Sequence, residues 1–439
     1  MWKSSIKVFT GIPFVLKLLD ADRGRNRLAD SVRPGPIESR GASCLRGIGA
    51  RILLRLPGDR VQPQPFEIRA TDAELSDLAQ RLAAVRWPMP VDEGWGFGTD
   101  LAWLRELVDF WRSDFDWRAQ EDWLQTVLPG QRVRIRDVEL HFSHLPGRGP
   151  KPFPLLLLHG WPSTFVEMHR IAGPLSDPVA HGGQAEDAFD VVVGTLPGHG
   201  FSTPFADPLY GADEMADCFR DLMVDVLGFD RFGAHGGDRG AFVTTGLAHR
   251  HPEYLAAIHQ NLPMGIAAPE RERTPEESAW LSDVARWQAE EGGYSAEQST
   301  RPLSLAYGLA DSPVGLAGWI CEKFHAWSDC GGDPLSRFTR EELLTTVMIY
   351  WLSRTIYPSM RCYRAHRMAP PAAVRPDRIE VPTGVALFPG EVMQPPRSAV
   401  ERKYRLEHWS EMDSGGHFPA LEEPAALIAD LRAFFRGYR

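Results

Sequence analysis

The stretch Gly236-Gly237-Asp238-Arg239-Gly240 is the part of this sequence that decides the fold. It follows the apolar segment 231–236, which has the length of a short buried strand, and it precedes residues 241–250, which lack proline and have helix-compatible spacing. Glycine on both sides lets the backbone bend sharply and lifts one side chain above a sheet. The stretch therefore predicts a strand, a tight turn and a helix, with Asp238 raised at the turn.

An aspartate at such a turn needs no base to become a nucleophile, because a carboxyl with a reference pKa of about 3.9 is already ionised at neutral pH. The positive end of the following helix favours the charge further. We therefore expect Asp238 to attack an electrophilic sp3 carbon and to form an alkyl ester. Glycine and aspartate also dominate ordinary turns, so this stretch alone leaves a purely structural turn open.

The composition is that of an ordinary globular protein, and it excludes some classes of partner and of metal site. The 439 residues are 43% hydrophobic and 24% charged, enough for one large domain with an insertion or for two to three domains. A formal net charge of -10 argues against nucleic acid as the principal partner. The cysteines are scattered, without C-x-x-C or paired histidine spacing, so neither a disulfide framework nor a zinc site is predicted: Cys44, Cys218, Cys321, Cys330 and Cys362.

Nothing in the sequence predicts a membrane span, because no stretch has about 18 uninterrupted apolar residues. The apolar segment 9–19 is short, and no convincing signal-peptide cleavage site follows it. We therefore expect a cytoplasmic protein.

Changes in pattern divide the chain into five segments. The first is rich in arginine and broken by Pro34-Gly35-Pro36, which favours a poorly ordered basic extension, with a membrane-surface segment as the alternative. The expected segments are the extension at 1–63, an N-terminal helical meander at 64–131, the first part of an α/β core at 132–263, a helical lid at 264–370 and the second part of the core at 371–439.

Strand and helix signals alternate through the core. Continuous apolar runs of strand length indicate strands covered on both faces, and helical segments separate them, so we expect a mostly parallel, doubly wound sheet. The expected strands are an antiparallel pair within 132–142, then 154–158, 189–193, 231–236, 383–388 and 406–412. The expected helices begin after the capping box Thr71-Asp-Ala-Glu74 and at Leu101, and continue at 163–175, 213–227, 276–291, 312–328, 340–357 and the C-terminal segment 427–435.

Three further stretches follow predicted strands, where they could assist Asp238. In His159-Gly-Trp-Pro162 the backbone N–H of Trp161, together with that of Arg239, could form an oxyanion hole, although a turn with a buried tryptophan is the simpler alternative. His417, in Ser414-Gly-Gly-His417, could activate the water that cleaves the ester. Glu391 could hold the tautomer and charge of His417, with Asp413 as a competing acid.

The lid offers acids for a strongly basic leaving oxygen. An alkoxide has a conjugate acid comparable to water at about 15.7, whereas a tyrosine O–H near pKa 10 can donate to it. Tyrosine is commonly a packing residue, and position alone does not choose among the candidates: Tyr294, Tyr307, Tyr350, Tyr357 and Tyr363.

With these residues in hand, the chain resembles epoxide hydrolases of the microsomal type, in their soluble bacterial branch, from about Phe66 to the C-terminus. The combination of motifs carries this resemblance, and any one of them alone is weak. The motifs are Arg86-Trp87-Pro88, His159-Gly-Trp-Pro162, Pro197-Gly-His-Gly-Phe-Ser-Thr-Pro204, the turn at Asp238, Asp311-Ser-Pro-Val-Gly-Leu316, Phe388-Pro-Gly-Glu391 and Gly415-Gly-His-Phe418.

The resemblance implies an α/β-hydrolase fold and an enzyme that opens a small hydrophobic epoxide with water, without metal or organic cofactor, and it makes a homodimer plausible. It implies Asp238 as nucleophile, His417 as base, Glu391 as its partner, and Tyr294 and Tyr363 as ring-opening donors. The chain departs from the family at Arg239, where tryptophan is usual. A guanidinium there could pair with the nucleophile or lower its pKa.

Two other functions stay open from the sequence. A haloalkane dehalogenase uses the same nucleophile, base and acid, but Arg239, and Trp161 before Pro162, count against it. A catalytically silent α/β-hydrolase that binds a hydrophobic ligand is the third interpretation, against which the retained catalytic groups argue.

Overall fold

A nine-stranded sheet lies at the centre of the part of the chain that the computed structural model describes, residues 62–89 and 94–439. Its strands follow the order β1-β2-β3-β5-β4-β6-β7-β8-β9. The strands from β5 to β9 in this order are parallel, whereas β3 pairs antiparallel with both β2 and β5. The bounds are β1 Gln64–Pro65, β2 Gly130–Ile135, β3 Val138–Leu145, β4 Phe153–Leu158, β5 Phe189–Gly194, β6 Phe232–Gly236, β7 Leu255–Gln260, β8 Ile379–Leu387 and β9 Tyr404–Glu411.

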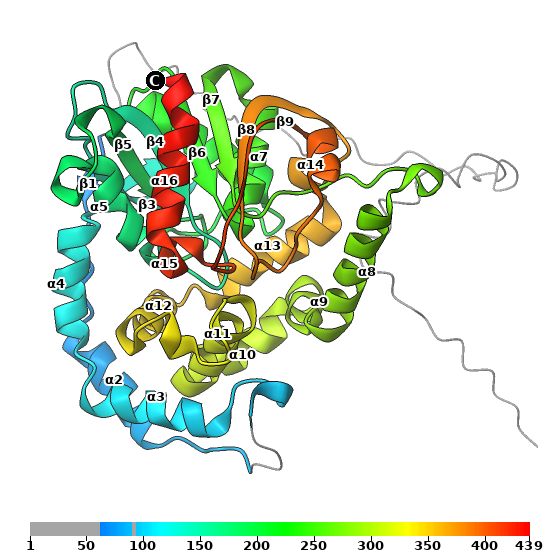
Figure 1. The fold of residues 1–439 in the computed structure, drawn as a ribbon. Coiled ribbons are helices and arrows are strands. Elements are labelled where there is room, and N and C mark those ends of the chain that lie inside the picture. Colours follow the sequence, from blue (N-terminus) through cyan, green and yellow to red (C-terminus); the bar gives the residue numbers. More distant parts are fainter. Residues whose placement is uncertain (1–61, 90–93) are drawn as a thin grey trace, which may run out of the picture. The chain divides into compact units, whose positions relative to one another are not determined.

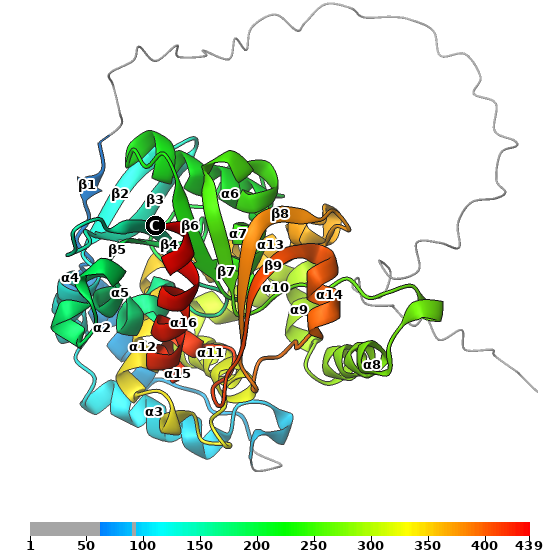
Figure 2. The same ribbon diagram turned by 45° about the horizontal axis from the view of Figure 1, so that its top comes forward.

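Helices cover both faces of this sheet, so the predicted mostly parallel, doubly wound architecture is confirmed (Figures 1 and 2). One face is covered by α5 and α16, which contact each other, and the other by α6 and α7. Covering on both faces explains the apolar run in β4, whose residues 155–158 are fully buried. These helices and their C-terminal neighbours are α5 His169–Ser176, α6 Ala212–Arg220, α7 Asp238–Arg250, α14 Arg397–Lys403, α15 Pro419–Glu422 and α16 Pro424–Phe435.

Three N-terminal helices lie between β1 and β2 along the chain, and a side chain caps the first turn of each. Thr71 Oγ1 accepts from Glu74 N, and the Glu74 carboxylate accepts from Thr71 N, which completes the predicted capping box. Asp100 and Asp116 cap the next two helices through their carboxylates. The three are α2 Asp72–Ala83, α3 Leu101–Ser113 and α4 Trp117–Val127.

Six helices, called the inserted helices below, lie between β7 and β8. Figure 1 shows α10, α11 and α12 between the sheet and the helices α2 and α3, and α11 contacts both α2 and α3. They are α8 Pro275–Glu290, α9 Gly293–Thr300, α10 Pro302–Asp311, α11 Pro313–Trp327, α12 Arg340–Ser353 and α13 Ile356–Met368. No helix within 62–89 and 94–439 is long and apolar enough to cross a bilayer.

The prediction of one helix over 340–357 is wrong, because the chain breaks at Arg354, whose φ is 56°. Pro358 explains the break: in a continuous helix its ring would collide with the carbonyl of Arg354, four residues earlier. The short helices α9 and α10 and the strand β7 were not predicted. β7 has the sequence Leu-Ala-Ala-Ile-His-Gln and is buried along its whole length. Its two alanines and its polar end give a weak strand signal in the sequence.

The basic extension expected over 1–63 lies outside the described residues as far as residue 61.

Candidate active site

Asp238 stands at the sharp turn between β6 and α7 with φ at 41°, in the left-handed region that non-glycine residues rarely adopt. The flanking glycines make this turn possible. A Cβ on Gly236 would lie 2.4 Å from the backbone carbon of Gly240, and a Cβ on Gly240 would lie 2.3 Å from Leu158 O. The elbow predicted from the sequence is therefore present, and its backbone packs directly against the end of β4.

His417 and Glu391 lie beside this elbow, on the loops after β9 and β8. His417 Nδ1 is 2.6 Å from Glu391 Oε1, and His417 Nε2 is 3.7 Å from Asp238 Oδ2. Glu391 is held in turn by the N–H of Val392 at 2.8 Å and by Asn261 Nδ2 at 3.2 Å. The structure thus brings acid, histidine and aspartate into one line, while the competing acid Asp413 is exposed.

The pKa of His417 is set by two opposing effects. Burial alone would lower it, but the charge and hydrogen bond of Glu391, with the charge of Asp238, outweigh burial and raise the pKa to about 9. His417 Nε2, on the side facing Asp238, has no hydrogen-bond partner among the described residues. This nitrogen is therefore open to a water or substrate atom placed between His417 and Asp238.

The loop after β4 supplies a donor to the same aspartate. The N–H of Trp161 donates to Asp238 Oδ1 at 2.8 Å. The peptide bond from Trp161 to Pro162 is cis, and the indole of Trp161 is fully buried. One of the two expected oxyanion donors is thus directed at the carboxylate on which charge would develop. Arg239, the other, is the second residue of α7.

Tyr294 on α9 and Tyr363 on α13 meet at the buried indole of Trp161. The ring of Tyr294 stacks on it at 5.5 Å, that of Tyr363 meets it edge-on at 5.8 Å, and the two tyrosine rings are 5.8 Å apart. Burial raises the pKa of both phenols, and the charge of Asp238 raises it further. Of the alternatives, Tyr307 is 71% exposed and Tyr350 Oη donates to Ser163 O.

The side chain of Arg239 contacts Tyr363 and His366 and forms no ion pair with Asp238 among the described residues, although the charge of Asp238 still acts on it. Its guanidinium carbon lies 3.7 Å above the ring of Tyr363, and its Nη1 is 3.3 Å from His366 Nδ1. The concern that Arg239 would form a direct ion pair with Asp238 is therefore not realised in this arrangement.

Three residues at the site were not anticipated from the sequence. Asn261 follows β7, a strand that was itself missed, and it supports Glu391. Trp327 accepts the N–H of His417 through its carbonyl and meets the imidazole edge-on at 5.0 Å. Glu167 is buried, and burial together with the charge of Asp238 raises its pKa to about 7 against the opposing charge of His417. An acid inside the apolar run Phe165-Val-Glu-Met168 was the available signal for Glu167.

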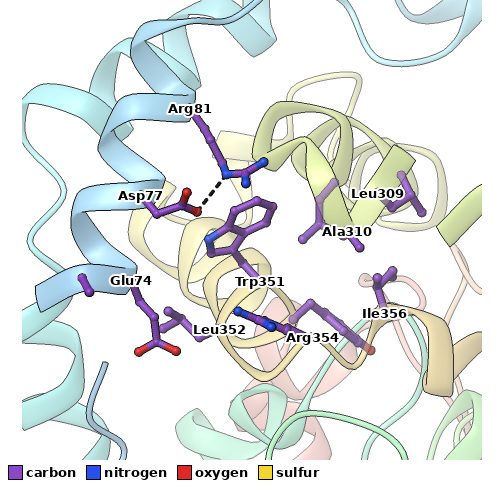
Figure 3. A pocket seen from close by; sticks show the side chains of 12 residues that line it. Glu74, Asp77, Arg81, Leu309, Ala310, Trp351, Leu352, Arg354 and Ile356 are labelled. Atoms are coloured by element: carbon purple, nitrogen blue, oxygen red, sulfur yellow. Dashed lines mark hydrogen bonds and ion pairs between the residues drawn. The ribbon is translucent and has the colours of Figure 1, made fainter. Parts of the chain in front are cut away.

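A separate pocket of about 540 Å³ lies where α2 meets α10 and α12 (Figure 3). Figure 3 shows Arg81 reaching over Trp351, with an ion pair to Asp77. None of the predicted catalytic residues lines this pocket, so it is distinct from the site around Asp238. No group of three or more metal-ligating side chains occurs in the described part of the chain.

Comparison with known proteins identifies the family and the fold. Residues 63–168 match the family "Epoxide hydrolase N terminus", and residues 154–289 match the alpha/beta hydrolase fold. A protein of Stigmatella aurantiaca strain DW4/3-1, named as a candidate epoxide hydrolase, is 39% identical over 85% of both chains. Epoxide hydrolase 1 of Oryctolagus cuniculus is 33% identical over 84% of this chain and 88% of its own.

Among solved structures, juvenile hormone epoxide hydrolase from the silkworm Bombyx mori superposes with a TM-score of 0.78 at 26% identity, covering 86% of this chain and 95% of its own. An elbow that carries aspartate, a histidine backed by glutamate, and relatives of this identity over most of the sequence lead to one assignment: the chain belongs to the epoxide hydrolases of the alpha/beta hydrolase fold.

Proposed function

We propose that this enzyme converts a small hydrophobic epoxide to a vicinal diol through a covalent ester of Asp238. The observation that carries the proposal is the position of His417 between two carboxylates, with Nδ1 2.6 Å from Glu391 Oε1 and Nε2 3.7 Å from Asp238 Oδ2. The N–H of Trp161 donates a hydrogen bond to the other carboxylate oxygen of Asp238. This arrangement has the parts that forming an ester and then hydrolysing it require.

In the first step one carboxylate oxygen of Asp238 forms a bond to an epoxide carbon. The bond from that carbon to the epoxide oxygen breaks, and its electron pair stays on the oxygen. Tyr294 and Tyr363 donate to this oxygen, which takes a proton from one phenol. A phenol suits this task because it is far more acidic than the alcohol that forms.

In the second step water attacks the carboxyl carbon of the ester. His417 accepts a proton from the water through Nε2, and Glu391 stabilises the imidazolium. The charge that develops on the carboxyl oxygen is met by the N–H groups of Trp161 and Arg239, and one such donor is typically worth about 2.7–4 kcal/mol. The diol leaves with one oxygen of Asp238, and the proton released by hydrolysis restores the phenol.

Trapping the ester tests the proposal. His417→Gln should be alkylated by a styrene-oxide-type or aliphatic epoxide but should not hydrolyse the ester, so intact mass spectrometry should show enzyme plus one substrate mass. Asp238→Asn/His417→Gln is the matched control, because it lacks the nucleophile and should gain no mass. Full turnover by His417→Gln without an adduct would contradict the covalent route.

A second experiment follows the oxygen atoms. In a single turnover in 18O-labelled water, the label should enter Asp238 and little should appear in the diol. Full labelling of the first diol would exclude the ester. Halide release from a bromoalkane that is unaffected by Tyr294→Phe and Tyr363→Phe would instead favour a dehalogenase.

A further inference from the structure

Each of the two lid tyrosines carries a positive charge against its ring. The guanidinium carbon of Arg239 lies 3.7 Å from the centroid of the Tyr363 ring, and Lys323 Nζ lies 4.9 Å from the centroid of the Tyr294 ring. The two cations come from different elements, Arg239 from the elbow helix α7 and Lys323 from α11. Each phenol of the pair thus has its own cation.

Arg239 is buried, and its surroundings fix it against Tyr363. Burial and the charge of Arg239 lower the pKa of His366 to about 3, so the imidazole is neutral and its Nδ1 accepts from Nη1 at 3.3 Å. Arg239 Nε has no hydrogen-bond partner among the described residues, which leaves the ring face as a main contact of the charge. A cation is seldom buried without compensation, so its position here calls for a role.

Lys323 is placed in the same way against Tyr294, although its charge is partly balanced. Its side chain is 6% exposed, and Nζ is 2.5 Å from Glu322 and 3.8 Å from Glu291. It also lies 5.4 Å from the ring of Trp327, which packs on His417. The ammonium therefore belongs to the aromatic cluster around the site.

A cation on the face of a phenol stabilises negative charge that spreads into the ring when the O–H gives up its proton. Burial has the opposite effect and raises the pKa of both phenols, while the charge of Arg239 lowers it. Without the charge of Arg239, two buried phenols beside the carboxylate of Asp238 would be weaker donors when the epoxide oxygen becomes an alkoxide, and Lys323 adds a second positive charge against the Tyr294 ring.

We propose that Arg239 and Lys323 are positioning residues that hold positive charge against the two ring-opening tyrosines, so that each phenol donates more strongly to the leaving epoxide oxygen. This inference rests on the function proposed above. It gives Arg239, the residue at which the chain departs from its family, a part in ring opening. The cations act through the phenols and touch neither the attacked carbon nor the hydrolytic water.

The test measures alkylation alone, as the single-turnover growth of the ester mass in the His417→Gln background. Arg239→Met and Lys323→Met should each slow alkylation about tenfold. Lys323→Arg, which keeps the charge, should restore most of the rate. In proteins that retain His417, the rate constant of ester hydrolysis should change little, since the phenols take no part in the attack of water.

Arg361→Met is the matched control. Arg361 lies 5.2 Å above the ring of Tyr210, also as a cation on a buried tyrosine, and it belongs to α13 like Tyr363, but neither partner is part of the site. Its removal should leave alkylation unchanged.

A double-variant cycle identifies the route of the effect. In the Tyr363→Phe background Arg239→Met should cause no further loss, because the phenol through which it acts is gone. The inference would be overturned if Arg239→Met slowed alkylation tenfold in the Tyr363→Phe background, or if it did not slow alkylation in the protein that retains Tyr363. Failure of His417→Gln itself to form any ester would instead overturn the proposed function, so the two outcomes are distinguishable.

Discussion

The charge of His417 changes during the proposed cycle. In the resting site its pKa is raised to about 9, so the imidazole is protonated at neutral pH and faces the ionised Asp238. Formation of the ester removes the negative charge of Asp238, and the pKa of His417 then falls. The same step that creates the ester therefore prepares the base that cleaves it.

Because the charge of His417 changes between the two steps, alkylation and ester hydrolysis should depend differently on pH. Ester hydrolysis requires neutral His417, so its rate constant should rise with pH to a plateau, with a midpoint below the value of about 9 that applies to the free site. Alkylation uses the carboxylate of Asp238 and the protonated phenols rather than neutral His417, so its rate constant should not follow that midpoint. Stopped-flow measurements of both steps across the pH range would check this, and a hydrolysis midpoint above that of the free enzyme would contradict it.

The tyrosines give a second prediction at this scale. Tyr294→Phe and Tyr363→Phe each remove one proposed proton donor and should lower the alkylation rate constant about 10²-fold, as loss of a general acid typically does. Tyr307→Phe is the control, because the side chain of Tyr307 is 71% exposed. Equal effects of all three substitutions would show that the lid tyrosines act only through packing.

At the scale of single elements, the elbow depends on close backbone contact. In Gly240→Ala the new Cβ would lie 2.3 Å from Leu158 O and 3.0 Å from His159 O, and backbone atoms of a central strand cannot move aside. We expect a loss of at least about 3 kcal/mol in the free energy of unfolding. Urea denaturation measures it.

Gly308→Ala provides the comparison for this prediction. Gly308 lies within α10 with no atom near its Cβ position, so alanine should stabilise the protein by about 0.5–1 kcal/mol. A similar loss in both variants would mean that contact with β4 is not what requires glycine at position 240.

Individual elements could be predicted from the sequence where one local rule governs them. The capping box at Thr71 and the continuous apolar run of β4 are such cases, and both agree with the structure. The break at Arg354 depends on one proline ring four residues later, a local signal that the helix prediction did not use. β7 contains few strongly apolar residues, and the strands β6 and β8, which pair with it, are separate from it in the sequence. Pairing between distant segments, which no local pattern contains, therefore decided β7.

The same holds for the site. Asp238, His417 and Glu391 were predicted because each follows a strand in a glycine-containing turn, and the structure places them together. Asn261 and Trp327 reach the site through a missed strand and an inserted helix, so nothing nearby in the sequence marked them. The contact of Arg239 with Tyr363 joins residues that lie far apart in the sequence, and their positions along the chain could not reveal it.

At the scale of the whole described molecule, ion pairs connect the sheet layer to the inserted helices, and the pair between Arg170 and Glu342 is one of them. Arg170 on α5 binds the Glu342 carboxylate of α12 through Nε at 2.8 Å and Nη2 at 2.7 Å. The two side chains are 30% and 10% exposed, so the pair is mostly removed from water.

Arg170→Met should therefore destabilise the protein by about 1–3 kcal/mol, less than a fully buried pair, because Glu342 keeps His169 at 3.1 Å. Arg81→Met, which breaks the exposed pair with Asp311 on α10, should cost less. Urea denaturation of both variants measures the difference, and an equal loss would contradict the importance of burial.

Asp238 and His417, the proposed nucleophile and base, lie on opposite sides of the inserted helices along the chain, and His417 comes after the last strand. During refolding, Asp238 can reach its turn early, but the site stays incomplete until β8 and β9 have joined the sheet and closed a very long loop. Catalytic competence should accordingly return late, well after most of the helical signal has recovered.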